Sequence, residues 1–329
     1  MENRHPGPGH PGNAQPGSSA QPGSNAQPGF DAQLSSNGRP SETALMAAAA
    51  RAAHLIVDDE PRIFADPLAA RLLGDRADEL ISYHTLHAAH PVLAGARVQV
   101  TCRSRYAEDS LARAAAGGVT QYVILGAGLD SFAYRGGLAR RLRVFEVDHP
   151  ASQQAKRAAL AAAGIPLGEN VALVPADLAA DPLMPGLARA GFDALAPAVF
   201  GWLGVTMYLT ADAVAETMTA IAGCAPGSEL IADYLLPPGA RDEDGALYGR
   251  LVAQASAERG EPWRSCFTPR EIAGLARDSG LGAARSVAQR DTIPARLWRR
   301  TDSLRPADLA VLFHAAVTGG PGASRPGSG

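Results

Sequence analysis

Short apolar runs rich in β-branched residues recur along the middle of the chain and alternate with segments of helical composition. Strands that alternate with helices pair in parallel through crossover helices. The order therefore predicts an α/β fold built on a doubly wound, mostly parallel, Rossmann-like sheet. Two later pieces, at 283–289 and 295–300, are predicted as its last two strands. The earlier runs are YVILG (122–126), RVFEVD (143–148), VALVP (171–175), AVFGWLGV (198–205) and ELIADYL (229–235).

The chain before the first strand has helical composition. Ser41, with an acid close behind it, precedes an alanine-rich stretch that reaches residue 56 and reads as a helix start. Further helices are predicted at 66–73 and 98–118, the latter closed by a glycine pair suited to a C-cap.

The two ends of the chain differ in composition from this folded region. AQPG recurs at a six-residue period near the start, and so short and polar a repeat cannot build a stacked core. We predict disordered tails at 1–40 and 319–329. The predicted folded domain, 41–318, consists of a helical cap at 41–118 and an α/β core at 119–318 with a lid insertion at about 236–268.

Charge and cysteine content exclude several classes of partner. Thirty basic against thirty-three acidic side chains give a formal charge of -3, which favours neither nucleic acid nor an anionic membrane. Residues 1–40 show no export or anchor pattern, so we expect a cytoplasmic protein without a membrane partner. Cys102, Cys224 and Cys266 are far apart and lack CxxC spacing, which argues against disulfides and structural zinc.

Histidines offer little catalytic or metal chemistry. His84, His87 and His90 recur every third residue, but on a helix that spacing spreads them around the surface, and no carboxylate or cysteine completes a ligand set. No metal is predicted. His149 precedes a helix that begins near Pro150 and is expected to act as its N-terminal residue.

The residues that follow the strands form the candidate site, because open parallel sheets bind ligands at the carboxyl ends of their strands. Gly126 and Gly128 flank Ala127 after the first strand, and without Cβ atoms they let backbone N–H groups approach a ligand. Asp148 ends the second strand, where its carboxylate can accept both hydroxyls of a ribose. Glu146 shares its face and is either a second cofactor contact or a partner for an arginine.

The third strand is followed by PADL, where Asp177 can accept an exocyclic amine and the Leu178 backbone N–H can reach a ring nitrogen of adenine. These residues describe an adenosine site, which dinucleotides and S-adenosylmethionine share. A dinucleotide motif requires a third glycine, and that position holds Ser131. Gly136 and Gly137 leave only a short helix after it. The pattern favours S-adenosylmethionine, with a nicotinamide-dependent oxidoreductase as the alternative.

Several sequence blocks of this chain, together with their order, resemble the leucine carboxyl methyltransferase family, in its bacterial branch of S-adenosylmethionine-dependent O-methyltransferases. The resemblance implies that Gly126 and Gly128 contact the methionine end of the cofactor, Asp148 the ribose, and Asp177 and Leu178 the adenine. The matching blocks, over about 41–280, are SETALMAAAARAAHL, FADPLA, CRSRYAEDSL, QYVILGAGLDSFAYR, RVFEVDHP, PADL, GVTMYLTADAV and EPWRSCFTPREIAGL.

The resemblance also implies that Arg103 pairs with the cofactor carboxylate, with Arg105 as the register-shifted rival. The chain departs from the family pattern at one position. Family members often have EGLLMYL where this chain has LGVTMYL, so Leu203 replaces a glutamate. A non-catalytic cofactor-binding protein of the same fold is therefore a further alternative.

The methyl acceptor is expected to be an oxygen, carboxylate or hydroxyl, of a small molecule, such as a secondary metabolite. No catalytic side chain is predicted, because the sulfonium already activates the methyl group and orientation supplies most of the acceleration. Tyr208, Trp263 and Phe267 are expected more often in the core than in a substrate wall. The sequence does not indicate an oligomeric state.

Overall fold

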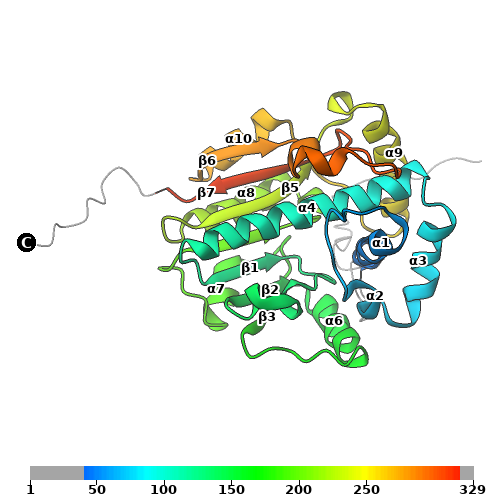
Figure 1. Cartoon of the computed structure of the whole chain (residues 1–329). Helices are drawn as coiled ribbons and strands as arrows, with labels where there is room; N and C mark the ends of the chain where they lie inside the picture. Colours follow the sequence, from blue (N-terminus) through cyan, green and yellow to red (C-terminus); the bar gives the residue numbers. More distant parts are fainter. Residues whose placement is uncertain (1–40, 319–329) are drawn as a thin grey trace, which may run out of the picture. The chain divides into compact units, whose positions relative to one another are not determined.

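The computed structural model describes residues 41–318, so the tails predicted at 1–40 and 319–329 lie outside the described residues. Its centre is a seven-stranded sheet in the order β3-β2-β1-β4-β5-β7-β6 (Figure 1). Strands β1 to β5 pair in parallel, which confirms the predicted doubly wound sheet. The strands are β1 (Gln121–Leu125), β2 (Arg143–Asp148), β3 (Val171–Pro175), β4 (Ala198–Trp202), β5 (Glu229–Leu235), β6 (Gly282–Val287) and β7 (Ala310–Ala316).

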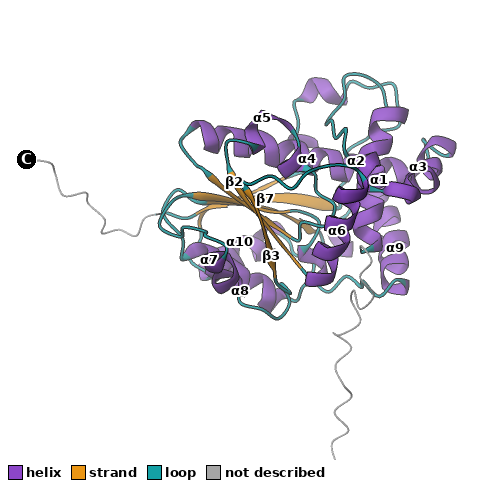
Figure 2. Ribbon diagram, turned by 90° about the horizontal axis from the view of Figure 1, so that it is seen from below, coloured by secondary structure: helices purple, strands orange, loops and turns teal. Residues whose placement is uncertain are grey.

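Helices cover both faces of the sheet and crowd one end of it. Figure 2 shows α4 and α5 on one side, α7, α8 and α10 on the other, and α1, α2, α3 and α9 gathered at one end. The helices are α1 (Glu42–Val57), α2 (Ala69–Leu72), α3 (Ala77–Leu86), α4 (Pro91–Ala116), α5 (Gly136–Ala139), α6 (Pro150–Ala162), α7 (Leu183–Arg189), α8 (Ala211–Ala222), α9 (Glu243–Glu258) and α10 (Pro269–Asp278).

The central strand β1 shows why two layers of helix are needed. Successive side chains point to opposite faces, and all five residues of β1 are buried. Val123 and Leu125 pack in the cluster that α7, α8 and α10 complete, whereas Tyr122 and Ile124 pack in the cluster completed by α4. Since the strand order reverses between β1 and β4, the topological switch point lies at the carboxyl ends of these two strands.

The helix boundaries follow the capping signals in the sequence. The Ser41 hydroxyl accepts a hydrogen bond from Ala44 N, as a helix N-cap does. Gly117 ends α4, and Gly118 has φ +99°, which suits a glycine after a C-cap. The predicted starts of α1 and α6 and the glycine pair after α4 are thus confirmed, although α4 begins at Pro91, earlier than expected.

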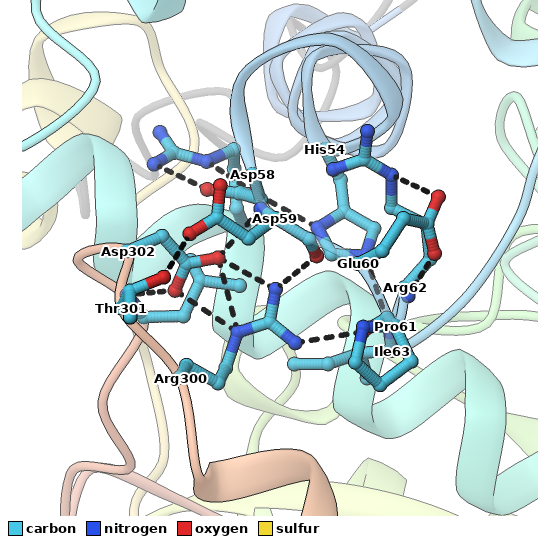
Figure 3. Close-up of polar contacts among 12 residues, drawn as sticks. His54, Asp58, Asp59, Glu60, Pro61, Arg62, Ile63, Arg300, Thr301 and Asp302 are labelled. Atoms are coloured by element: carbon cyan, nitrogen blue, oxygen red, sulfur yellow. Dashed lines mark hydrogen bonds and ion pairs between the residues drawn. The ribbon is translucent and has the colours of Figure 1, made fainter.

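The end of the sheet differs from the prediction. The segment predicted as a strand at 283–289 forms β6, but 295–300 is not a strand; it contains the 3-10 turn Ala295–Trp298, and the remaining strand is β7, antiparallel to its neighbours β5 and β6. The reason lies in Arg300, whose guanidinium donates to the carbonyls of Asp59 and Pro61, at 2.6 and 2.8 Å, and pairs with Asp302 (Figure 3). Side-chain contacts with the loop after α1 therefore hold this segment away from the sheet.

Candidate functional site

A tight turn after β1 forms the floor of the site. The N–H groups of Gly126 and Ala127 donate to Val147 O at 2.8 and 3.2 Å, which folds the turn over the end of β2. Gly126 has φ +69°, and a Cβ there would stand 2.4 Å from a methyl carbon of Val205. Gly128 has φ +41° and lies against Ala44 of α1. Only glycine fits the first position, because Val205 packs directly against its α-carbon.

Asp148 is held at the carboxyl end of β2. Its Oδ2 accepts from Gly128 N at 2.6 Å, and its Oδ1 accepts from His149 N at 2.7 Å. Burial raises the pKa of Asp148, and these two backbone donors oppose the shift. The carboxylate is thus fixed beside the glycine turn, and each oxygen keeps further acceptor capacity for a hydroxyl. His149 caps α6 through its side chain, as expected for an N-terminal residue.

Glu146 has a structural role. It is fully buried, and its Oε2 lies 2.8 Å from Nζ of Lys156 and accepts from the Tyr134 hydroxyl at 3.1 Å. Burial raises the pKa of Glu146, and the Lys156 ammonium opposes it. The partner is a lysine where the sequence suggested an arginine. Of Glu146 and Asp148, which share a face of β2, Asp148 is therefore the one at the carboxyl end of the strand.

Asp177 and Leu178 follow β3, next to the end of β2, since Pro175 is in register with Asp148. Oδ1 of Asp177 accepts from Ala179 N at 2.9 Å, and its own N–H donates to Asp181 at 2.9 Å. The loop is therefore closed on itself, and its half-buried residues Asp177 and Leu178 lie beside the end of β2. The structure thus brings the glycine turn, Asp148 and this loop together at the carboxyl ends of β1, β2 and β3.

Arg103 and Arg105 point to different surroundings. Nη1 of Arg103 lies 3.3 Å from Oδ2 of Asp233 on β5, with its side chain 18% exposed. Arg105 pairs instead with Asp109 at 2.7 Å and donates to the carbonyl of Ile63. Of the two rivals, only Arg103 lies beside the ends of β4 and β5.

Asp233 is a residue of the site that the sequence reasoning missed. Its side chain is 1% exposed, and Oδ1 accepts from Gly204 N at 2.5 Å. Its backbone carbonyl accepts from the Thr206 hydroxyl at 2.5 Å. The available signal was the aspartate among apolar residues in the run ELIADYL. Leu203 packs against the apolar cluster that contains Tyr122, whereas Asp233 is a carboxylate that bonds this turn, through Gly204 N.

Ser131, which stands where a dinucleotide motif has its third glycine, fastens the cap to the glycine turn. Its hydroxyl donates to Asp66 Oδ1 at 2.6 Å and accepts from Arg135 Nε at 2.7 Å. Arg51 of α1 donates to Asp66 at 2.9 Å and to Leu129 O at 2.7 Å. Although burial opposes it, Arg51 and Arg135 lower the pKa of Asp66.

The three histidines that recur at every third position lie in different places. His84 is buried and accepts from Arg97, whereas His87 ends α3 and His90 precedes α4. Within 41–318 no group of three or more histidine, cysteine, aspartate or glutamate side chains is placed to hold a metal ion. In the same range, no helix is long and apolar enough to cross a bilayer.

Comparison with known proteins identifies the family to which this chain belongs. The family described as "Leucine carboxyl methyltransferase" matches residues 44–222. A Bacillus subtilis protein named "Putative S-adenosyl-L-methionine-dependent methyltransferase YktD" is 30% identical over 297 residues, covering 84% of this chain and 97% of that protein. A Mycobacterium tuberculosis protein of like description is 36% identical over 218 residues, 64% of this chain and 68% of its own length.

Solved structures agree on the fold. A Thermobifida fusca crystal structure described as that of a "putative methyltransferase" superposes with a TM-score of 0.55 at 22% identity. The match covers 86% of this chain and 97% of that one.

Proposed function

This chain belongs to the leucine carboxyl methyltransferase family and is an S-adenosyl-L-methionine-dependent methyltransferase, and from that premise we propose that it methylates an oxygen, carboxylate or hydroxyl, of a small molecule. One observation carries the proposal. The glycine turn, Asp148 and the Asp177 loop lie together at the carboxyl ends of the neighbouring strands β1, β2 and β3, beside the switch point between β1 and β4, where a nucleoside binds in folds of this kind.

Each end of the cofactor has a candidate partner. The Asp148 carboxylate would accept the ribose hydroxyls, and the loop at Asp177 and Leu178 would hold the adenine. The turn at 126–128 and the Arg103 guanidinium would hold the methionine part, the latter by pairing with its carboxylate. Asp233 then has a positioning role, because it contacts both Arg103 and Gly204. This arrangement does not use the glutamate that Leu203 replaces.

Methyl transfer requires of the protein mainly that it orient the acceptor toward the cofactor. The sulfonium of the bound cofactor supplies an activated methyl group for in-line displacement. The chain has to hold the acceptor oxygen in line and exclude water, and orientation of this kind is worth about 7 to 11 kcal/mol. A carboxylate acceptor is already ionised at neutral pH, so no general base is needed; a phenol or alcohol would require one.

The acceptor can be identified with labelled cofactor. The purified chain is incubated with methyl-labelled S-adenosylmethionine and a metabolite extract, and the label is traced. We expect it in small molecules. Label found only on protein would contradict the small-molecule proposal and leave the methyltransferase standing. A rate that is flat from about pH 6 to 9 would indicate a carboxylate acceptor, and a rate that rises over that range a phenol or alcohol.

Three measurements separate the alternatives. Calorimetric titration with S-adenosylmethionine tests the cofactor site directly, and production of S-adenosylhomocysteine excludes a non-catalytic binding protein. A shift in nicotinamide fluorescence on titration with the chain would favour the oxidoreductase. We expect cofactor binding and turnover without any nicotinamide signal.

A further inference from the structure

A cavity lies between α9 and the end of β5, beside the candidate site. Its volume is about 510 Å³, within the range of small-molecule sites. Leu235 and Trp263 give it an apolar wall, three arginines, Arg241, Arg250 and Arg264, line it, and Cys266 lies at its lining. The α9 segment falls in the insertion expected to act as a lid. Phe267, next in sequence, is buried in the core, so of the aromatic pair Trp263 and Phe267 only Trp263 lines the cavity.

Two of the three arginines of this cavity, Arg241 and Arg250, are placed to meet an anion. Arg241 stacks on the Trp263 ring, with Cζ 5.9 Å from its centroid, and Nε donates to Leu236 O at 2.8 Å. Burial lowers the pKa of Arg241, so this charge is partly stripped of water. Among the described residues no carboxylate forms an ion pair with Arg241 or Arg250. A guanidinium held against an aromatic face binds carboxylate or phosphate well.

Hydrogen bonds join the cavity wall to the turn that follows β4. Arg264 N donates to Met207 O at 2.6 Å, and the Ser265 hydroxyl donates to Thr206 O at 3.0 Å. The same turn begins at Gly204, which contacts Asp233 and lies against Arg103. The cavity therefore borders the turn whose other end touches the proposed methionine site.

We propose that this cavity binds the end of the methyl acceptor that is not methylated, and that this end carries a carboxylate or phosphate on an apolar body. The inference rests on the proposed small-molecule function and narrows its substrate class. Trp263 would contact the apolar body, while Arg241 and Arg250 would pair with the distal anion. An acceptor of this kind would extend from the cofactor past the 204–208 turn into the cavity.

Cys266 provides a direct probe of occupancy. It is the exposed thiol of the chain, whereas burial keeps Cys102 and Cys224 protonated, with pKa values raised to about 12 and about 11. N-ethylmaleimide should therefore modify Cys266 first, and mass spectrometry identifies the site. We expect 2-naphthoate or 2-naphthyl phosphate to slow this modification at lower concentration than the neutral 2-naphthalenemethanol. The anion that protects Cys266 at the lower concentration shows whether the distal group of the acceptor is a carboxylate or a phosphate.

Variants test whether charge pairing causes the protection. Arg241→Gln and Arg250→Gln should each raise the half-protecting concentration about tenfold, the loss expected for one charge-assisted contact. Arg277→Gln, which removes a 76% exposed arginine on α10, should leave it unchanged. Arg250 is exposed, so its variant remains informative if Arg241→Gln does not fold.

Equal protection by the neutral probe, or no protection by either anion, would overturn the proposal. So would protection that survives both arginine substitutions. Because the assay contains no S-adenosylmethionine, its result is independent of cofactor binding. Failure of the methyltransferase assignment would instead appear as absent heat on cofactor titration of the same preparation.

Discussion

The guanidinium of Arg103 lies flat against the α-carbon of Gly204. A Cβ at Gly204 would stand 2.4 Å from Nη2 and 2.7 Å from Cζ of Arg103, too close for any real contact. Gly204 also has φ +73°, a conformation that side chains rarely adopt. The absence of a side chain at 204 therefore sets where Arg103 can be, and the same N–H that bonds Asp233 fixes the turn.

Gly204→Ala should displace Arg103 and weaken S-adenosylmethionine binding at least about tenfold, which corresponds to ~1.4 kcal/mol. Calorimetric titration measures the change. Gly191→Ala is the matched control, because Gly191 has a similar φ of +86° and a Cβ added there would meet nothing within 4 Å. An unchanged dissociation constant in a folded Gly204→Ala variant would exclude Arg103 from the methionine site.

Asp148→Ala should weaken cofactor binding by about 1.5 to 3 kcal/mol, the range for hydrogen bonds to a charged group. The variant also removes an acceptor for Gly128 N, so its melting temperature has to be measured alongside. Asp193→Ala provides the comparison, since Asp193 likewise accepts a backbone N–H, from Leu195, in the loop before β4. Affinity within twofold of the parent would mean that Asp148 does not hold the ribose.

Ser131→Ala should destabilise the fold by about 1 to 3 kcal/mol, because it removes one donor to the buried Asp66 carboxylate and the acceptor of Arg135 Nε. Urea unfolding measures the loss. Ser82→Ala, which removes a hydroxyl that donates to Glu79 O within α3, should cost much less. If the two variants were equally stable, the Ser131 network would not fasten the cap to the glycine turn.

His84 should make the fold sensitive to acid. Burial, and then the charge of Arg97, lower its pKa from 6.5 to about 4. Between these values the unfolded chain binds a proton that the folded chain does not, so stability present above pH 6.5 is lost as the pH falls toward 4. The loss amounts to about 2 to 4 kcal/mol.

His84→Gln keeps an acceptor for Arg97 but cannot titrate. Its free energy of unfolding, followed by urea titration from pH 7 to pH 4.5, should decline less steeply than that of the parent. His87→Gln, at the end of α3, should follow the parent curve. Parallel curves for His84→Gln and the parent would show that His84 is not held neutral in the folded chain.

The sequence alone determined the first five strands, the parallel sheet and the glycine turn, because each rests on local signals. An apolar run identifies a buried strand, and a glycine pair or a Ser–acid start identifies a helix end. Gly126, Gly128, Asp148 and Asp177 lie at or within three residues of a strand's carboxyl end, so the rule that ligands bind at these ends was enough to group them. Their roles toward the cofactor remain predictions.

The tertiary structure decided which polar residues from distant parts of the sequence lie together at the candidate site. Arg103 and Asp233 are separated by 130 positions and meet at 3.3 Å, a contact that no local pattern encodes. The same holds for Arg300, whose contacts with the loop after α1 keep 295–300 out of the sheet and leave β7 to fill the place between β5 and β6. Hydrogen bonding and burial between distant segments settle such choices, because the energies that separate the alternatives arise only when those segments pack together.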